Sequence, residues 1–392
     1  MRMTLVISTL RGGGAERVVT NMANYWARKG WPVTVLTITH GNEAPYYQLD
    51  PLVVHRDMGF YRKPLPMVPN VGALMALKEI FDDCSPHERR TLIPELDLVV
   101  KLRRAIIDTR PQVVISFINL TNIRVLLATQ GLGLPVIVSE RDDPYHDPLT
   151  EGAAQLRRRL YPLAKYMVAQ TAEAADYFAA DVGDRRRAIP NPVLRPALSN
   201  PCNDNTGNGA GAPKARRILV GMGRLVEEKG FALLLSAFSK VAAKHPSWSL
   251  QIWGEGPQRR ALEQLTRDLS LSERVEMPGF TRRPFEALSR ADLFAMSSLI
   301  EGFPNALCEA MACGLPVVSF NCSSGIREII RDGVDGLLVR AADPTALAVA
   351  LDRLMADEEE RRRLASKALE VTERFGLDKT MARWEQLVLD PV

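Results

Sequence analysis

The sequence predicts an α/β fold in two similar halves, each built on a doubly wound parallel sheet. Short apolar runs alternate with stretches of helical periodicity in both halves, which is typical of parallel strands whose two faces are covered by helices. Residues 196–215 are rich in Asn, Gly and Ala, a composition that indicates a linker. The length of 392 residues is also sufficient for two domains of ordinary size.

Composition excludes several classes of protein. Hydrophobic residues make up 46% of the chain and charged residues 24%, which is typical of a soluble globular protein, and a net charge of +4 does not suggest a nucleic-acid partner. No apolar run approaches the roughly 18 residues of a membrane span. The first residues are too strand-like for a signal peptide. The five cysteines lack zinc-type spacing and the five histidines are scattered, so we expect a cytoplasmic protein without a bound metal.

The first predicted domain, residues 1–195, opens with a strand, a glycine-rich loop and a helix. Gly12, Gly13 and Gly14 lack a β-carbon, so backbone N–H groups at the helix start can approach an anion, with a plain tight turn as the alternative. No acidic residue ends the second strand, which argues against a dinucleotide site. Strands are expected at 3–9, 31–39, 52–55, 111–117, 134–139 and 166–169, and helices up to about 28, at 95–108, from 119, at 155–161 and at 172–179.

The second predicted domain, residues 216–375, repeats the alternation. The helical segment at 376–392 is expected to pack back on the first domain. Two such halves form a cleft between them, and clefts between domains are preferred ligand sites. Strands are expected at 218–222, 249–253, 274–277, 293–296, 317–320 and from 336, and helices at 231–244, 258–269, 284–288, 306–312 and beyond 344.

Two glutamates mark the mouth of the second sheet. Glu301 lies in the loop after the strand at 293–296, and Glu309 lies about one turn into the following helix, for which Asn305 is a plausible N-cap. Solvated carboxylates at a helix end are the alternative. A glycosidase pair is disfavoured, because eight helical residues span about 12 Å whereas retaining glycosidases hold their carboxylates about 5 Å apart.

Two cations follow the first strand of the second domain. Gly223 and Arg224 begin a loop that reaches Lys229 just before a helix, and two cations at that place suit a diphosphate. Ordinary surface charge is the alternative. Phe280 follows the strand at 274–277 and is a candidate ligand contact, with a strand-ending turn as the alternative.

These motifs together resemble the retaining glycosyltransferases of family four, the sucrose-synthase-like family. The resemblance rests on Glu301-Gly-Phe-Pro, on Glu309 eight residues later, on the closing Ala-Cys-Gly-Leu-Pro-Val-Val, and on Gly-Arg-Leu followed by Lys-Gly. It implies the GT-B fold, in which two Rossmann-like domains face each other across a cleft. It also implies transfer of a hexose or N-acetylhexosamine, with retained configuration, from a nucleotide diphosphate sugar to a hydroxyl, with UDP favoured as the nucleotide.

The resemblance also assigns roles to residues. Glu309 is expected to hold the ribose hydroxyls, and Arg224 and Lys229 the leaving diphosphate. Glu301, with the backbone of 303–305, is expected to face the donor sugar. No Asp-x-Asp triplet is present, so we expect no metal and no cofactor. The catalytic candidates are Glu301, Arg224 and Lys229, and the donor-binding candidates are Gly13, Gly14, Gly223, Arg224, Lys229, Phe280, Glu301, Gly302, Phe303, Pro304, Asn305, Leu307 and Glu309.

Motifs in the first domain resemble those of one particular branch of this family. Ser116-Phe-Ile-Asn-Leu-Thr-Asn-Ile and Pro135-Val-Ile-Val-Ser-Glu-Arg are similar to the branch of N-acetylgalactosamine transferases that build bacterial lipid-linked glycans. This implies a polyprenyl-diphosphate-linked glycan acceptor and peripheral contact with the anionic inner face of the membrane, for which Arg157, Arg158 and Arg159 are the expected patch. The acceptor-binding candidates are Asn119, Asn122, Glu140 and Arg141; helix caps and a local ion pair are the alternatives.

Two other functions remain open from the sequence. One is an inactive subunit that binds a nucleotide sugar and regulates a partner. The other is an NAD-dependent oxidoreductase built on two doubly wound halves.

Overall fold

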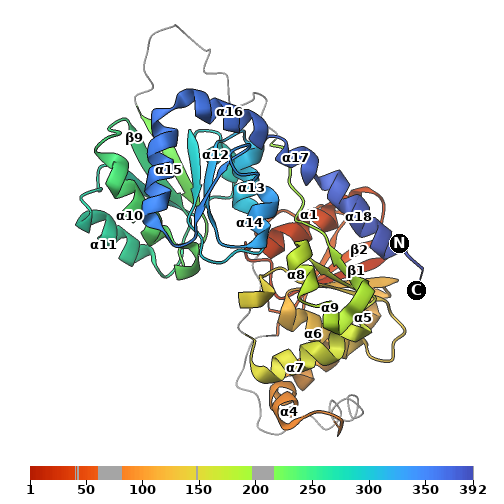
Figure 1. Cartoon of the computed structure of the whole chain (residues 1–392). Helices are drawn as coiled ribbons and strands as arrows, with labels where there is room; N and C mark the ends of the chain where they lie inside the picture. Colours follow the sequence, from red (N-terminus) through yellow and green to blue (C-terminus); the bar gives the residue numbers. More distant parts are fainter. Residues whose placement is uncertain (40, 42–43, 61–81, 147–148, 197–215, 392) are drawn as a thin grey trace. The chain divides into compact units, whose positions relative to one another are not determined.

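The computed structural model describes residues 1–39, 41, 44–60, 82–146, 149–196 and 216–391 (Figure 1). These residues form two compact units, Met1–Pro190 with Thr380–Val392, and Asn191–Lys379. Most of the linker expected at 196–215 lies outside the described residues. The second unit begins at Asn191, so residues 191–195, which the sequence assigns to the first domain, belong to the second unit.

The first unit contains a seven-stranded sheet in the order β3-β2-β1-β4-β5-β6-β7, and every strand pair is parallel. The chain moves outward from β1 to β3 and then returns to β4 beside β1, so the strand order reverses between β1 and β4. The six predicted strands are confirmed, whereas β7 has an Arg-Arg-Ala sequence without an apolar run and was not predicted. The strands are β1 (Met3–Ile7), β2 (Val33–Thr37), β3 (Val54–Asp57), β4 (Val113–Phe117), β5 (Val136–Ser139), β6 (Tyr166–Ala169) and β7 (Arg186–Ala188).

Helices cover this sheet because each presents an apolar stripe to it. Leu102 and Ile106 of α5, Leu126 of α6 and Leu156 of α7 join one buried cluster with Val114 and Val138 of the strands. The helices are α1 (Gly14–Arg28), α4 (Pro86–Leu92), α5 (Leu96–Thr109), α6 (Asn119–Thr129), α7 (Glu151–Leu160), α8 (Ala172–Asp176) and α9 (Ala179–Val182).

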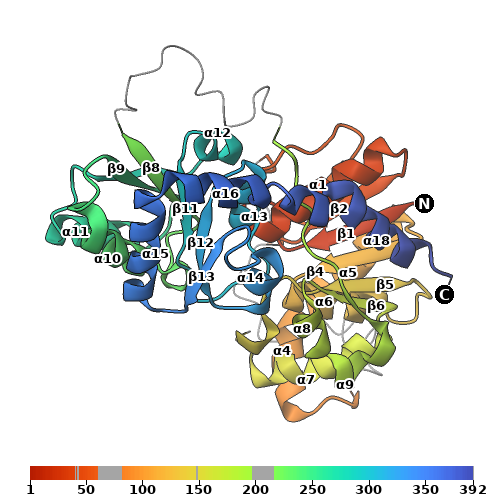
Figure 2. The same cartoon turned by 45° about the horizontal axis from the view of Figure 1, so that its top comes forward.

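The second unit contains a six-stranded parallel sheet in the order β10-β9-β8-β11-β12-β13. Figure 2 shows the run from β9 through β8, β11 and β12 to β13. Here the strand order reverses between β8 and β11. The strands are β8 (Arg217–Met222), β9 (Trp248–Trp253), β10 (Val275–Gly279), β11 (Leu293–Met296), β12 (Val317–Asn321) and β13 (Leu337–Arg340). The helices are α10 (Phe231–Ala242), α11 (Arg259–Asp268), α12 (Pro284–Leu288), α13 (Asn305–Ala312), α14 (Ser324–Ile329), α15 (Pro344–Ala356), α16 (Glu358–Ala368) and α17 (Val371–Arg374).

The last helix, α18 (Leu377–Leu389), starts in the second unit and continues in the first from Thr380. Trp384 is fully buried, with its ring 6.5 Å from that of Phe117, and Glu385 forms a 2.6 Å ion pair with Lys29, the C-cap of α1. The end of the chain is therefore packed on the first unit. In the parts of the chain that the structure describes, no helix combines the length and the apolar character that crossing a membrane requires.

Candidate functional site

In the second unit, the loops after β8 and β11 meet at the carboxyl edge of the sheet. These strands are neighbours at the point where the strand order reverses, which is where open α/β sheets bind ligands. The Leu299 N–H donates to Glu228 O at 2.7 Å, and the Ser297 hydroxyl donates to Lys229 O at 3.0 Å. We call residues 298–305 the Glu301 loop. The two loops are thus joined by direct hydrogen bonds.

The centre of this site is an ion pair between two of the predicted catalytic residues. Lys229 Nζ lies 2.6 Å from Glu301 Oε1, and the side chains are only 21% and 11% exposed. The Ser298 hydroxyl donates to the same carboxylate oxygen at 2.7 Å. Loss of either side chain would leave the other as an unpaired charge that is largely shielded from water, which is unfavourable. The ion pair therefore holds both side chains in position. The sequence placed both residues at the sheet edge but did not predict their pairing.

Glycine is required where the β8 loop approaches the β11 loop. Gly230 has φ +60°, and a Cβ built there would lie 2.0 Å from Ser297 O. Any larger residue would separate the two loops, so Gly230 permits the approach that brings Lys229 to Glu301.

Arg224 is the second predicted cation. Its side chain is exposed, and among the described residues its guanidinium has no hydrogen-bond or ion-pair partner. The adjacent Gly223 is fixed by its N–H, which donates to Trp253 O at 2.9 Å. The loop therefore presents one cation already balanced by a carboxylate, Lys229, and one that has no partner in the described parts of the chain, Arg224.

Helix α13 carries the second glutamate. Glu309 is 7% exposed, in a stretch of α13 that is buried from Leu307 to Ala312, and Phe303 and Pro304 of the Glu301 loop are also buried. The expectation that Asn305 caps this helix is wrong. Pro304 is the N-cap and Asn305 is the first helical residue, with its Oδ1 accepting a 2.9 Å hydrogen bond from Asn191 Nδ2.

Two cysteines near the glutamates hold their protons tightly. Burial raises the pKa of the Cys308 thiol well above its usual range, and the adjacent Glu309 raises it further. Burial, assisted by the negative charge of Glu301, raises the pKa of Cys322 to about 12. Both are therefore thiols rather than thiolates at neutral pH, and neither is an activated nucleophile.

The remaining donor-side candidates of the second unit are Phe280 and Gly302. Phe280 follows β10, which is separated from β8 by β9, and its ring is 48% exposed at the carboxyl edge of the sheet. Gly302 belongs to the Glu301 loop, and its carbonyl lies against the backbone of Gly325 at the start of α14. Within the described residues, no group of three or more His, Cys, Asp and Glu side chains could hold a metal ion.

Gly13 and Gly14 belong to the first unit, where Gly13 is the N-cap of α1 and Gly14 its first residue. The Glu16 carboxylate folds back toward this end of the helix: it accepts a 3.1 Å hydrogen bond from the Thr9 hydroxyl and would lie 2.2 Å from a Cβ at Gly13. A carboxylate is stabilised by the positive end of the helix dipole. An anionic ligand at these glycines would therefore compete with Glu16.

The acceptor-side candidates sit at the carboxyl edge of the first sheet. Asn122 is fully buried: its Oδ1 accepts from the Ser116 hydroxyl at 2.7 Å, and its Nδ2 donates to Ser139 O at 3.1 Å and to Glu140 Oε1 at 3.4 Å. The Tyr161 hydroxyl donates to the same oxygen of Glu140. Asn122 and Glu140 thus belong to one buried polar network.

A strained backbone residue precedes Asn119. Ile118 has φ +75°, a conformation that a β-branched residue rarely adopts, and no side chain caps α6. The helix-cap interpretation of the two asparagines is therefore wrong. Asn119 instead accepts a 2.5 Å hydrogen bond from the next N–H, that of Leu120. Such strain persists only where the surroundings impose it, and it is common at functional sites.

Arg141 is held by aromatic rings. Its guanidinium lies 5.2 Å from the ring centroid of Phe117 and 5.7 Å from that of Trp384 on α18. Burial lowers the pKa of Arg141 to about 9, although the charges of Glu140 and Asp142 oppose the shift. The sequence predicted Arg141 but not Trp384, because only the fold brings the end of the chain to this edge of the sheet.

The predicted basic patch on α7 is wrong. Arg157 is 5% exposed, with its guanidinium over the rings of Tyr177 at 5.4 Å and Phe178 at 5.1 Å. Arg159 donates to Asp83 O at 2.8 Å and lies 3.4 Å from the Asp83 carboxylate. Consecutive residues of a helix point in different directions. Only Arg158 of the three is exposed.

Two family models match the chain. One is described as a glycosyl transferase 4-like domain and matches residues 13–192; the other is described as glycosyl transferases group 1 and matches residues 205–371.

Several curated proteins are also similar along the whole chain. An exopolysaccharide phosphotransferase of Streptomyces coelicolor is 29% identical over 97% of this chain, which spans only 40% of that protein's length. A Campylobacter jejuni protein is 24% identical over 100% of this chain and 99% of its own length. Its name describes an alpha-1,4-N-acetyl-D-galactosaminyltransferase that acts on a GalNAc-alpha-(1->4)-GalNAc-alpha-(1->3)-diNAcBac-PP-undecaprenol.

Two solved structures resemble the whole chain. The Anabaena protein HepE, in complex with UDP and glucose, has a TM-score of 0.79 at 18% identity, with 99% of each chain covered. Sucrose-phosphate synthase from Thermosynechococcus elongatus has a TM-score of 0.77 at 19% identity, with 98% of each chain covered.

Proposed function

The chain belongs to the glycosyl transferases whose two family models match its halves, and we propose that it moves a hexose or N-acetylhexosamine from a UDP-sugar to a glycan hydroxyl with retained configuration. Its similarity to the solved structures confirms the predicted GT-B fold class, with two Rossmann-like doubly wound domains.

The observation that carries the proposal is the arrangement of charges at the carboxyl edge of the second sheet. Lys229 and Glu301 form a 2.6 Å ion pair where the strand order reverses, with the exposed Arg224 on the same loop as Lys229 and the buried Glu309 in the helix that follows Glu301. Cations that bind a diphosphate and a carboxylate that binds ribose hydroxyls are the groups that a nucleotide diphosphate sugar requires.

The chemistry follows from where charge develops. As the sugar–oxygen bond breaks, negative charge grows on the diphosphate, and cations already in place stabilise that charge without reorganisation. We assign this role to Arg224 and Lys229. Lys229 is kept in position by Glu301, which we propose faces the donor sugar with the backbone of residues 303–305. This assignment predicts transfer without a metal ion, so that activity survives EDTA.

We propose that the acceptor is a lipid-linked saccharide, encountered at the cytoplasmic face of the membrane. The Campylobacter relative supports this, because its name specifies a PP-undecaprenol-linked acceptor. In the first unit, Asn119, Glu140 and Arg141 are the proposed acceptor contacts. Asn122 acts through Glu140, because its amide is fully buried and engaged in hydrogen bonds.

The test is release of free nucleotide from a panel of nucleotide sugars, with and without EDTA, by the wild type and by Lys229→Met, Glu301→Gln and the double variant. Each single variant should lower turnover by at least tenfold. Because the two side chains form one pair, the losses should be less than additive in the double variant. Losses that add fully would mean that the two residues act independently, and no release by the wild type from any donor would overturn the proposal.

An inactive nucleotide-sugar-binding subunit is the competing function. It predicts UDP binding by calorimetry together with no release of nucleotide from any sugar donor, whether or not an acceptor is present. We favour the enzyme because all four charged residues of the motifs, Arg224, Lys229, Glu301 and Glu309, are present in the chain.

A further inference from the structure

We propose that Asn191 and Phe375 are positioning residues that hold the Glu301 loop in the geometry required by the donor sugar. Asn191 is the first residue of the second unit, Asn191–Lys379, and Phe375 lies four residues before its end. Both are far from the catalytic motifs in sequence. The inference rests on the proposed function for the identity of the ligand, and it concerns residues outside every motif that predicted the site.

Asn191 holds the loop through its side-chain amide. Its Nδ2 donates to Phe303 O and to Asn305 Oδ1, both at 2.9 Å, so both N–H bonds of the amide are directed at the loop. The side chain is 4% exposed, which removes competition from water. An aspartate at this position would have the same shape, but its carboxylate oxygen would replace the donating Nδ2 and face two other acceptors, Phe303 O and Asn305 Oδ1.

Phe375 holds the same loop through an aromatic contact. Its ring lies 5.2 Å from that of Phe303 at an interplanar angle of 83°, an edge-to-face arrangement. The Val193 N–H donates to Phe375 O at 2.8 Å, so the segment that begins the second unit is paired with the segment that ends it. Phe303 therefore contacts both segments, one through its carbonyl and one through its ring.

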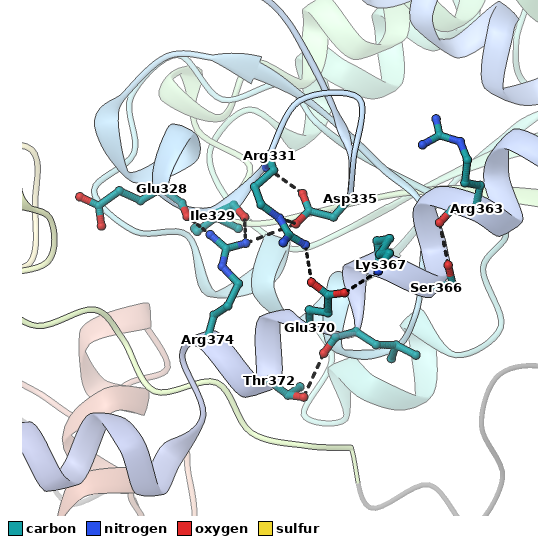
Figure 3. A network of polar contacts seen from close by, with 11 residues as sticks. Glu328, Ile329, Arg331, Asp335, Arg363, Ser366, Lys367, Glu370, Thr372 and Arg374 are labelled. Atoms are coloured by element: carbon teal, nitrogen blue, oxygen red, sulfur yellow. Dashed lines mark hydrogen bonds and ion pairs between the residues drawn. The ribbon is translucent and has the colours of Figure 1, made fainter.

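Phe375 is itself supported by Arg374, which belongs to a network of charged groups; Figure 3 shows the network around Arg374. The guanidinium of Arg374 lies 4.8 Å from the ring centroid of Phe375. It also donates to Ile329 O at 2.7 Å and to the carboxylate of Asp335 at 3.3 Å, and Asp335 is fully buried. Arg331 binds the same carboxylate at 2.6 Å. The support of Phe375 is thus anchored to the end of α14.

The Glu301 loop is consequently held on two sides. The β8 loop holds one side through the Lys229–Glu301 pair and the Leu299–Glu228 hydrogen bond. Asn191 and Phe375 hold the other side, and a Cβ at Gly325 would lie 1.7 Å from Gly302 O, so α14 closes against the loop as well. Misplacement of reacting groups by about 1 Å can lower a rate 100-fold. Releasing the Asn191 side should therefore impair sugar transfer while UDP binding through Glu309 persists.

The test compares Asn191→Asp with Asn24→Asp. Asn24 is a matched control, because its Nδ2 also donates to a backbone carbonyl, Gln48 O at 2.9 Å, but in the first unit. We expect Asn191→Asp to bind UDP within about threefold of wild type and to release nucleotide from the sugar donor at least tenfold more slowly, a loss in kcat rather than in KM. Phe375→Leu should change the same step in the same direction.

Amide hydrogen exchange gives a readout that does not depend on activity. Peptides covering residues 299–307 should exchange faster in Asn191→Asp and unchanged in Asn24→Asp. Unaltered exchange in the loop, or equal losses of UDP affinity and turnover, would overturn the positioning role. If the wild type binds UDP but releases no nucleotide from any donor, the proposed function fails, whereas the exchange result still decides whether Asn191 holds the loop.

Discussion

Glu309 is the residue whose surroundings most limit what it can bind. Glu309 is 7% exposed on α13, so a ligand that reaches its carboxylate meets a charge with little competition from water. Glu309→Gln should weaken UDP binding by about tenfold or more, because a hydrogen bond to a charged group contributes about 1.5–3 kcal/mol. Calorimetry measures the change.

The control for this variant is Glu263→Gln, which removes a surface carboxylate paired with Arg259 at 2.9 Å on α11. That variant should bind UDP as the wild type does. Equal affinities of Glu309→Gln and wild type would remove Glu309 from the donor site.

Cys322 reports on the charge of Glu301. The pKa of this thiol is raised from 9.0 to about 12, first by burial and then by Glu301. Between pH 7 and 9 the thiolate fraction should therefore be about 1,000-fold below that of an ordinary cysteine, and alkylation by iodoacetamide should be correspondingly slow and rise tenfold per pH unit.

Replacing Glu301 by Gln removes one cause of the shift, so Cys322 should then react faster at the same pH. Mass spectrometry of the alkylated peptide gives the rate, with urea-unfolded protein as the reference. A rate in the folded wild type equal to that of the unfolded chain would contradict the raised pKa.

At the scale of single elements, the strand–loop–helix around Glu301 was predictable from the sequence. A buried parallel strand is a continuous apolar run, and Gly-Phe-Pro interrupts it before helical spacing resumes. Strand β7 and helix α14 were missed, because neither has such a run or a long apolar stripe. Asn191 could not be predicted either, since a lone asparagine between two prolines indicates a turn and carries no sign of its partners 112 and 114 residues away.

Helix α18 should stabilise the first unit rather than the second. Trp384 is fully buried against Phe117 and Arg141, so Trp384→Ala should lower the free energy of unfolding of the first unit by about 3–5 kcal/mol. Hydrogen exchange resolves the two units: peptides from β4 and β5 should lose protection, and those from β8 and β11 should not.

The matched control is Leu389→Ala on the same helix, where the side chain is 56% exposed and the expected change is within about 0.5 kcal/mol. Equal loss of protection in both units would show that α18 stabilises the chain as one cooperative block.

At the scale of the whole molecule, both sheets place their candidate residues beside the reversal of strand order. Gly13 and Asn119 follow the neighbouring strands β1 and β4, as Arg224 and Glu301 follow β8 and β11. The alternation of strands and helices predicted doubly wound parallel sheets but not the order of their strands, because crossovers of one hand are compatible with more than one order. The surface was less predictable: charge along the sequence does not show which arginines a fold buries, and Arg157 was wrongly placed in a membrane patch for that reason.

The burial of Arg157 changes how a lipid-linked acceptor must be tested. Replacing all three arginines of α7 would remove a buried cation that packs on Tyr177 and Phe178, so lost activity could reflect a damaged first unit. Arg158→Ala is the informative variant, because its side chain alone of the three is exposed. A single basic residue near an anionic leaflet contributes about 1 kcal/mol, so vesicle binding should fall by at most about fivefold.

A comparison of lipid-linked and free saccharides tests directly whether the acceptor is lipid-linked. Wild-type protein should transfer sugar to a polyprenyl-diphosphate-linked saccharide in anionic vesicles at least tenfold faster than to the same saccharide free in water, because the lipid confines the acceptor and supplies a diphosphate beside it. Arg158→Ala should preserve this ratio while weakening sedimentation with vesicles at low salt. A ratio near one with the wild type would contradict the lipid-linked acceptor and leave a water-soluble glycan as the substrate, since the donor chemistry of the second unit does not depend on how the acceptor is carried.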